Sequence, residues 1–234
     1  MTPALSGLSG IRQVGPGFSW GDYPGLVHRY DPSNLTNLVI ANSLVSQATD
    51  LTGNGNHAVQ ANASLQPTTV ELVSGKYALQ GNAVAFLATT AAIDAAAKTV
   101  FAIVKAPEGN TVRHFSGAAQ SRLGITAADA RFIRAGTQLS CGAYTANTLE
   151  LWLAEFNSTA SNLYVNGGTP TGTGDAGNST DATLTLLSLA SGTQATDGAL
   201  GDYVRFNRVL TTAEKNVIGN ALATKWGLTW TAIS

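Results

Sequence analysis

The sequence predicts an all-β fold, a sandwich or a barrel, with one helix near the C-terminus and an extended arm at the N-terminus. Short apolar or alternating runs follow one another at spacings of about 8–12 residues, as in such folds. Clusters of Gly and Asn, such as Thr52–Asn56 and Asn166–Gly168, separate these runs. Because Gly and Asn tolerate the backbone angles of tight turns, the clusters mark the ends of strands.

Residues 1–25 are rich in Gly and Pro and have no periodicity, so we expect an extended arm there and one domain over residues 26–234. The arm carries large apolar side chains that a free linker would not need. Two interpretations stay open: the arm folds back over its own domain, or it docks on a neighbouring subunit. In the second case the partner-binding residues are Leu5, Leu8, Ile11, Phe18, Trp20 and Tyr23.

The strands are expected where β-forming residues run between turn signals. Thr148–Glu155 alternates most clearly, with leucines on one face and Glu150 and Trp152 on the other, which predicts a half-buried strand. In chain order the expected strands are Gly25–Tyr30, Ala58–Ala61, Ala78–Gln80, Ala83–Leu87, Thr99–Lys105, Thr111–Phe115, Leu123–Thr126, Arg131–Arg134, Thr148–Glu155, Asn162–Val165, Ala182–Leu189 and Ala199–Phe206.

Two stretches predict helices. Ala91–Lys98 is rich in alanine but short. Thr211–Trp226 has the stronger signals, because Thr211 and Glu214 match a capping box and an apolar stripe repeats at helical spacing. Gly227 stands where a helix-ending glycine belongs.

The charge content excludes several classes of partner. Charged residues make up 12% of the chain, against about 25% in typical soluble domains. Since 13 basic residues balance 14 acidic ones, we expect no nucleic-acid partner and no polybasic membrane contact. The single Cys141 cannot form an internal disulfide. The first ten residues lack the pattern of a signal peptide, so a protein that looks extracellular is expected to be exported by another route or released when a cell lyses. This expectation points towards a virus particle.

Several motifs, taken in order, resemble bacterial and phage laminin-G-like jelly rolls of the concanavalin A-like class. In that family a strand ending in Asp is followed by a D-x-S/T-G-N-G-N-H turn, a Q-P-T segment and a strand with a G-x-x-x-x-F pattern. The resemblance implies an antiparallel two-sheet jelly-roll sandwich over nearly the whole domain. The matching segments are Leu26–Asp31, Val45–His57, Gln66–Thr68, Tyr77–Leu87, Leu163–Gly167 and Asp202–Leu228.

Catalytic and metal-binding patterns are weak, so the sequence predicts no enzyme and no cofactor. Jelly-roll glycoside hydrolases need two carboxyl groups on one face, whereas Glu150 and Glu155 fall on opposite faces of one strand; hydrolysis is the remote alternative. The oxygen ligands of Asp50, Asn54 and Asn56 could hold Ca²⁺. A structural turn accounts for them better, because only one of the three is a carboxylate.

Two functions are expected from these observations. The first is a bacteriophage virion protein, a capsid decoration or cement subunit that binds the major capsid protein through its arm and one sandwich face. Such a protein lies on the particle surface and forms homo-oligomers, for example trimers. The alternative is a carbohydrate-binding, lectin-like or receptor-binding tail module for host-surface glycans. Its sugar-stacking aromatics would be Tyr144, Trp152 and Trp230.

Overall fold

A computed structural model describes residues 18–90, 95–109, 113–117, 121–180, 183–189 and 194–234. No helix in these ranges is long and apolar enough to cross a membrane. The strands and the helix are β1 (Leu26–Tyr30), β2 (Leu38–Ala41), β3 (Leu44–Ala48), β4 (Ala58–Val59), β5 (Thr68–Val73), β6 (Lys76–Gln80), β7 (Leu87–Ala88), β8 (Lys98–Lys105), β9 (Arg113–Gly117), β10 (Ser121–Ile125), β11 (Ala130–Ala135), β12 (Gln138–Ala143), β13 (Glu150–Phe156), β14 (Ser161–Val165), β15 (Gly172–Gly174), β16 (Thr185–Leu186), β17 (Ala199–Phe206) and α1 (Thr212–Trp226).

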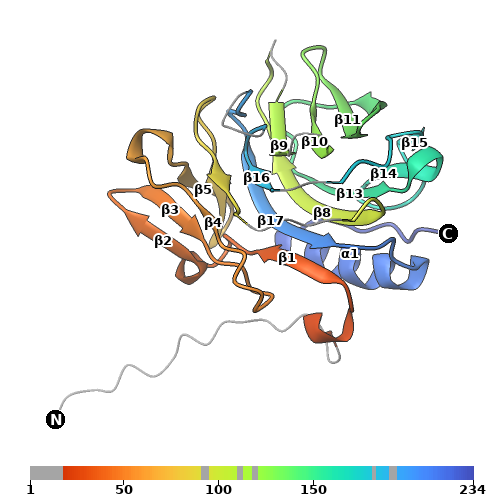
Figure 1. Cartoon of the computed structure of the whole chain (residues 1–234), viewed down its shortest axis with the longest axis horizontal. Helices are drawn as coiled ribbons and strands as arrows, with labels where there is room; N and C mark the ends of the chain where they lie inside the picture. Colours follow the sequence, from red (N-terminus) through yellow and green to blue (C-terminus); the bar gives the residue numbers. More distant parts are fainter. Residues whose placement is uncertain (1–17, 91–94, 110–112, 118–120, 181–182, 190–193) are drawn as a thin grey trace.

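The strands form two antiparallel sheets, which confirms the predicted two-sheet sandwich (Figure 1). Sheet A has the order β15-β14-β13-β8-β17-β6-β5, and β1 also pairs with β17. Sheet B has the order β12-β11-β10-β9-β16-β7-β4-β3-β2. The chain therefore crosses repeatedly between sheets, and neighbouring strands come from distant parts of the sequence.

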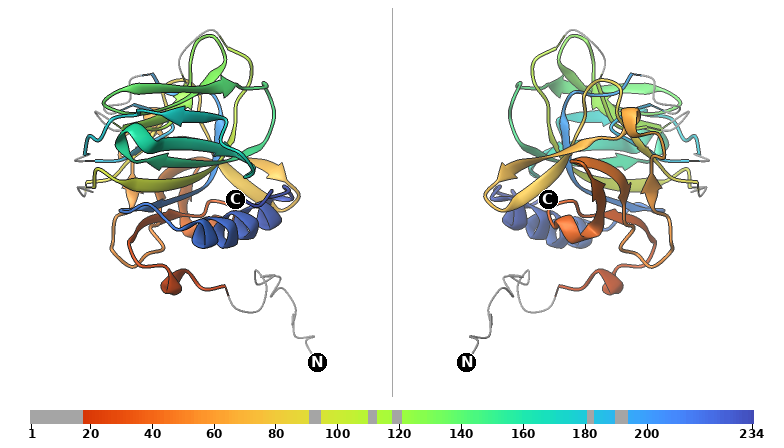
Figure 2. Two further views of the ribbon diagram at one scale, coloured as in Figure 1. Left: turned by 90° about the vertical axis from the view of Figure 1, so that its right-hand side faces the viewer. Right: turned by 90° about the vertical axis from the view of Figure 1, so that its left-hand side faces the viewer.

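Two layers of apolar side chains hold the fold together. The inner layer lies between the sheets and includes Trp152 of sheet A and Phe115 of sheet B, whose rings meet edge to face at 5.5 Å. The outer layer lies between sheet A and α1, where Phe101 and Leu153 pack with Trp226. Figure 2 shows α1 lying along one side of the sandwich. Sheet A is thus covered on both faces.

The helix begins and ends as the sequence predicts. The Thr211 side chain accepts a hydrogen bond from the Glu214 backbone, and the Glu214 side chain accepts one from the Thr211 backbone, so both halves of the capping box are present. Gly227 follows in the left-handed conformation, with φ 67°. A terminal helix of this kind can be read from sequence because its signals are local.

The structure corrects the half-buried strand predicted around Glu150. All seven residues of β13 are buried, because its leucines meet α1 on one side while Trp152 faces the inner core. The predicted alternation of side chains along β13 is confirmed, whereas the prediction that one of its faces meets solvent is wrong. Glu150 and Glu155 do lie on opposite faces, since Glu150 pairs with Arg131 of sheet B and Glu155 pairs with Lys215 of α1.

The predicted helix over Ala91–Lys98 is not a helix where it is described. Residues 91–94 lie outside the described residues, residues 95–97 are irregular, and Lys98 is already the first residue of β8. The run of alanines is too short to form a stable helix without packing. Tertiary pairing with β13 and β17 instead extends the strand.

Candidate functional site: the outer face of sheet B

The outer face of sheet B is the sheet face of the described sandwich that α1 does not cover. The inner faces of both sheets pack against each other, and the outer face of sheet A is covered by α1. Side chains alternate between the two faces of a strand. On β11, Ile133 and Ala135 belong to the inner core, so Phe132 and Arg134 point outward. Phe132 and Thr185 of β16 are nonetheless buried, so the exposed side chains of this face lie near its two edges.

One register position runs across the whole of this face. We call it the outer row: each of the nine strands contributes one residue, and each pairs with the next across the ladder. The outer row changes from aliphatic side chains at one end, through a glycine, to arginines and an amide at the other. Its members are Val39, Gln47, Val59, Ala88, Thr185, Gly117, Arg122, Arg134 and Gln138.

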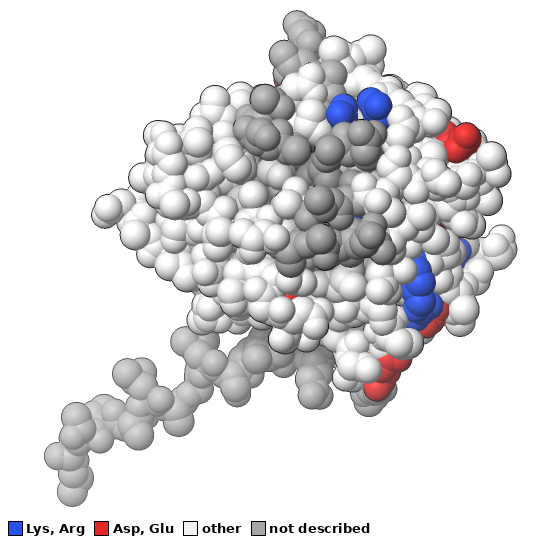
Figure 3. All heavy atoms as spheres, in the orientation of Figure 1, with Lys and Arg blue, Asp and Glu red and all other residues white. Residues whose placement is uncertain are grey.

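The basic end of the outer row is a pair of arginines on neighbouring strands. Arg122 of β10 and Arg134 of β11 stand directly opposite each other, and both are partly exposed. Burial and the charge of Arg134 lower the pKa of Arg122. Arg134 Nε donates to the Gly136 carbonyl at 3.1 Å, and Arg134 forms no ion pair with a carboxylate of the described residues. Figure 3 shows basic side chains side by side above β10 and β11.

The edge strand β12 adds neutral polar groups beside the arginines. Gln138 and Ser140 are exposed, whereas the next residue, Cys141, is buried in the inner core. Gln138 pairs with Arg134, and Ser140 pairs with Phe132. An amide and a hydroxyl both donate and accept hydrogen bonds. This end of the face therefore offers the mixture of groups that sugar hydroxyls require.

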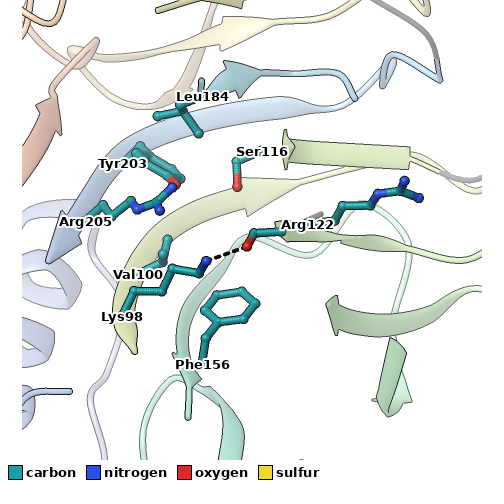
Figure 4. Close-up of a pocket in the computed structure, with 9 residues that line it drawn as sticks. Lys98, Val100, Ser116, Arg122, Phe156, Leu184, Tyr203 and Arg205 are labelled. Atoms are coloured by element: carbon teal, nitrogen blue, oxygen red, sulfur yellow. Dashed lines mark hydrogen bonds between the residues drawn. The ribbon is translucent and has the colours of Figure 1, made fainter. Parts of the chain in front are cut away.

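Behind the arginine pair, a small pocket opens between the sheets (Figure 4). Lys98 is fully buried there; its Nζ donates to Ser121 Oγ at 2.5 Å and to the Ser179 carbonyl at 3.0 Å. The Phe156 ring lies 5.3 Å from the same nitrogen. The Arg122 side chain points away from Lys98 (Figure 4). With a volume of about 10 Å³, the pocket has room for about one water molecule and none for a sugar.

Two of the aromatics predicted to stack on sugars are buried, which corrects that prediction. Trp152 has no exposed surface, and Tyr144 is 5% exposed. Trp152 Nε1 donates to Glu150 Oε2 at 2.6 Å, and the Tyr144 hydroxyl donates to the Thr148 carbonyl at 2.9 Å. Their polar atoms are engaged inside the sandwich, so neither ring presents a face to a glycan.

Trp230 lies on the other side of the molecule, against α1. Its Nε1 donates to Asn216 Oδ1 at 3.1 Å, and its ring packs over Gly219, where a Cβ would stand 2.4 Å from the indole. The side chain is partly exposed. It lies away from the outer row, and its role as a sugar contact stays a prediction.

The residues predicted to bind a partner through the arm fall into two groups. Leu5, Leu8 and Ile11 lie outside the described residues. Phe18, Trp20 and Tyr23 pack against the outer layer beside sheet A. The Arg29 guanidinium lies 4.8 Å from the centre of the Trp20 ring, and the Arg208 side chain donates to the Pro24 carbonyl. The root of the arm therefore folds back on its own domain, as the first of the two interpretations expects.

In the turn that suggested a Ca²⁺ site, the Asp50 carboxylate accepts hydrogen bonds from the chain itself. Asp50 is buried and accepts hydrogen bonds from the backbones of Arg29, Thr52 and Asn56 and from the Thr52 hydroxyl. His57 Nδ1 accepts from the Asp50 backbone at 3.1 Å. No group of three or more His, Cys, Asp or Glu side chains within the described ranges could hold a metal ion. The oxygens of Asp50 thus fasten the turn to β1.

The histidine of β1 is a buried neutral base. His28 has no exposed surface, and its Nδ1 lies 3.0 Å from the Tyr30 hydroxyl. Because that hydroxyl donates to the Asn56 carbonyl, Nδ1 carries the proton, and Nε2 has no partner among the described residues. Burial, with the charge of Arg205 adding to it, lowers the pKa of His28 to about 3.

We expect His28 to make the fold sensitive to mild acid. Below pH 6.5 the unfolded chain protonates this histidine, whereas the folded chain does so only near pH 3. The contribution of neutral His28 to the free energy of unfolding is therefore complete above pH 6.5. It is lost as the pH falls, by about 1.4 kcal/mol per pH unit. Urea unfolding between pH 7 and pH 4 measures the slope. In His28→Phe the slope should be smaller by about one proton; an unchanged slope would mean that the histidine is already charged in the fold.

No protein-family model matches this chain, and no curated protein matches it in sequence. Solved structures match its fold. The Trypanosoma rangeli sialidase in complex with sialic acid matches with a TM-score of 0.57 and 15% identity over 86% of this chain and 33% of the sialidase. Domain 4 of the extracellular arabinanase AbnA from Geobacillus stearothermophilus, in complex with arabinotriose, matches with a TM-score of 0.56 and 14% identity over 80% of this chain and 94% of that domain. The binding domain of Paraclostridial mosquitocidal protein 1 matches with a TM-score of 0.58 and 11% identity over 85% of this chain and 52% of that one.

These likenesses show a β-sandwich fold of the kind found in carbohydrate-binding domains. They also correct the prediction that the chain is no enzyme, because several of the similar structures are sialidases. The fold is therefore no ground for excluding an activity. At 15% identity, and with the chain spanning a third of the sialidase, the likeness establishes no activity either. The chain is similar in fold to parts of glycan-active proteins and to a domain solved with a bound glycan.

Proposed function

We propose that this chain is a carbohydrate-binding module that holds a glycan on the outer face of sheet B. The observation that carries the proposal is the match to nearly the whole of an arabinanase domain whose structure contains arabinotriose. The arabinanase match covers 94% of the matched domain, whereas the sialidase match covers 33% of the sialidase chain. The sialidase, solved in complex with sialic acid, adds support from the same fold.

The surface chemistry of β12 supports the same conclusion. Gln138 and Ser140 are exposed on the open face, and their side chains both donate and accept hydrogen bonds. Sugars are recognised through such groups together with apolar contacts to their C–H faces. At the far end of the outer row, Val39 and Val59 are 49% and 39% exposed. Because Phe132 and Thr185 between these two ends are buried, we assign the glycan to the polar end of the face, at β12.

A glycan array probed with the whole chain tests the proposal, with and without Ca²⁺. For the glycan that binds, Gln138→Ala combined with Ser140→Ala should weaken binding about tenfold or more, because each neutral hydrogen bond contributes about 0.5–1.5 kcal/mol. The matched control removes an amide and a hydroxyl from the exposed side of α1, as Asn220→Ala with Thr224→Ala. Silence on every glycan, or a loss in the control pair alone, would contradict the proposal.

A role in a virion remains a prediction from the sequence, and it is compatible with sugar binding. It depends on the arm, whose residues 1–17 lie outside the described residues. Because Phe18, Trp20 and Tyr23 pack on the domain, the informative deletion removes residues 1–17 and leaves this aromatic cluster in place. If the arm attaches the protein to a particle, the shortened chain should fold but no longer sediment with particles.

A further inference from the structure

The sequence contains two Asn-Gly pairs, Asn54–Gly55 and Asn166–Gly167, and the fold treats them differently. In such a pair the backbone nitrogen of the glycine can attack the side-chain amide of the asparagine, because glycine has no Cβ to hinder the approach. We infer that Asn54 is a site of spontaneous deamidation in the folded protein and that the fold protects Asn166. This inference does not depend on the proposed function.

The Asn54–Gly55 pair is open to the reaction. Both residues are exposed, and a Cβ placed on Gly55 would meet no atom within 4 Å. The backbone N–H of Asn54 donates to Thr52 Oγ1 at 3.2 Å. Within the described part of the chain, the Asn54 side chain and the Gly55 backbone nitrogen form no hydrogen bond. The amide carbon and the attacking nitrogen can therefore approach each other without giving up a hydrogen bond of the fold.

The Asn166–Gly167 pair is held in place by its neighbours. Asn166 Oδ1 accepts from the Leu151 backbone at 2.9 Å, and the backbone of Asn166 makes further hydrogen bonds to Leu151 and Thr231. Gly167 is buried, and a Cβ there would collide with the Thr231 carbonyl. The Asn166 amide cannot turn towards the Gly167 nitrogen while these contacts last. The turn must therefore open locally before it can react.

The reaction balances with water as its only co-reactant. The Gly55 nitrogen bonds to Cγ of Asn54, and the bond between Cγ and the amide nitrogen breaks. Water carries the proton of the Gly55 nitrogen to the amide nitrogen, which leaves as ammonia. Water then adds to either carbonyl carbon of the succinimide ring and opens it. The product is aspartate or isoaspartate, so the protein exchanges one amide for one carboxylate.

Deamidation changes both the charge and the length of the turn between β3 and β4. It adds a negative charge to a chain whose net charge is −1, and isoaspartate adds one atom to the backbone. The Asn56 backbone donates to Asp50, and the Asn56 side chain donates to the Val27 carbonyl. The extra atom must therefore be accommodated by residues 53–55. Sheet B carries β12 at its opposite edge, so glycan binding there should not change, and the two proposals fail independently.

Peptide mapping by mass spectrometry tests the inference on the whole chain during incubation in a mildly alkaline buffer. The Asn54 peptide should deamidate about tenfold or more faster than the Asn166 peptide, because the hydrogen bonds that hold Asn166 must first break. In urea, which unfolds the chain, the two rates should become similar. No conversion of Asn54 in the folded chain, or equal rates at Asn54 and Asn166 there, overturns the inference.

Variants assign the reaction to Asn54. Anion-exchange chromatography should resolve an acidic form that accumulates during the incubation, and Asn54→Asp should elute with it from the start. Asn54→Gln should suppress this form, because glutamine closes the corresponding larger ring much more slowly. Asn220→Gln is the matched control on the exposed side of α1, where alanine follows the asparagine, and should leave the accumulation unchanged. An acidic form that accumulates undiminished in Asn54→Gln would contradict the assignment.

Discussion

Replacing Arg131 with methionine should lower the free energy of unfolding by about 3–5 kcal/mol, the usual loss when one partner of a buried ion pair is removed. Arg131 and Glu150 are 8% and 4% exposed and join the two sheets through the inner core. Arg131 Nε donates to Glu150 Oε2 at 2.9 Å, and a second bond joins Arg131 Nη2 to Glu150 Oε1. The same carboxylate accepts from Trp152. Without the guanidinium, Glu150 would keep a buried charge with one neutral donor.

Chemical denaturation of Arg131→Met and of Arg131→Met/Glu150→Gln measures this effect. The double variant should be more stable than the single one, because it removes the uncompensated charge while the amide oxygen still accepts from Trp152. Lys76→Met is the surface control and should change the stability by less than about 0.5 kcal/mol. If the single and double variants are equally unstable, the loss comes from packing and not from the buried charge.

Replacing Trp226 with alanine should also lower the stability by about 3–5 kcal/mol, as expected for a large buried aromatic. Trp226 is 1% exposed and fixes α1 on sheet A. Its Nε1 donates to Asp202 Oδ2 at 2.5 Å, and its ring lies over Gly201, where a Cβ would come within 2.7 Å of it. Burial and the nearby Asp31 raise the pKa of Asp202 to about 6, although Lys225 opposes this shift. Removing Trp226 therefore opens a cavity and takes a donor from a buried acid.

Two further variants separate the ring from its N–H group. Trp226→Phe keeps most of the packing and should lose about 1–3 kcal/mol, the effect of leaving a buried acceptor without its donor. Val217→Ala changes the exposed side of the same helix, where Val217 is 47% exposed, and should be neutral within about 0.5 kcal/mol. Unfolding curves in urea give all three values. A Trp226→Ala variant as stable as Val217→Ala would show that α1 is not part of the cooperative fold.

Local signals predicted the parts of this fold that depend on neighbouring residues in sequence. The capping box at Thr211, the Asp50 turn and the strand at β17 all appear where the sequence places them. The hairpin of β2 and β3 was missed, although Asn42 and Ser43 join two apolar runs there and adopt positive φ values of 51° and 66°. Such a two-residue turn usually contains glycine, and its absence hid the hairpin.

The candidate site could be predicted only in part, because it depends on strand order. The sequence placed strands at Leu123–Thr126 and Arg131–Arg134 with a short turn between them, and extending that hairpin brings Arg122 opposite Arg134. The rest of the outer row joins strands as distant as β2 and β16, and no local pattern fixes their neighbours. The buried positions of Tyr144 and Trp152 likewise follow from how the two sheets pack, which alternation along one strand does not reveal.

Because α1 covers the outer face of sheet A, we call that side of the sandwich the back and the outer face of sheet B the front. The aromatic residues that begin the described chain and Ile233 near its end both pack into the layer beside α1, so both ends lie at the back (Figure 2). A partner attached at Phe18 or next to Ile233 would sit behind the domain and leave sheet B pointing away from the attachment. A surface or a larger assembly that holds the domain by the side of α1 therefore leaves the outer face of sheet B turned outward.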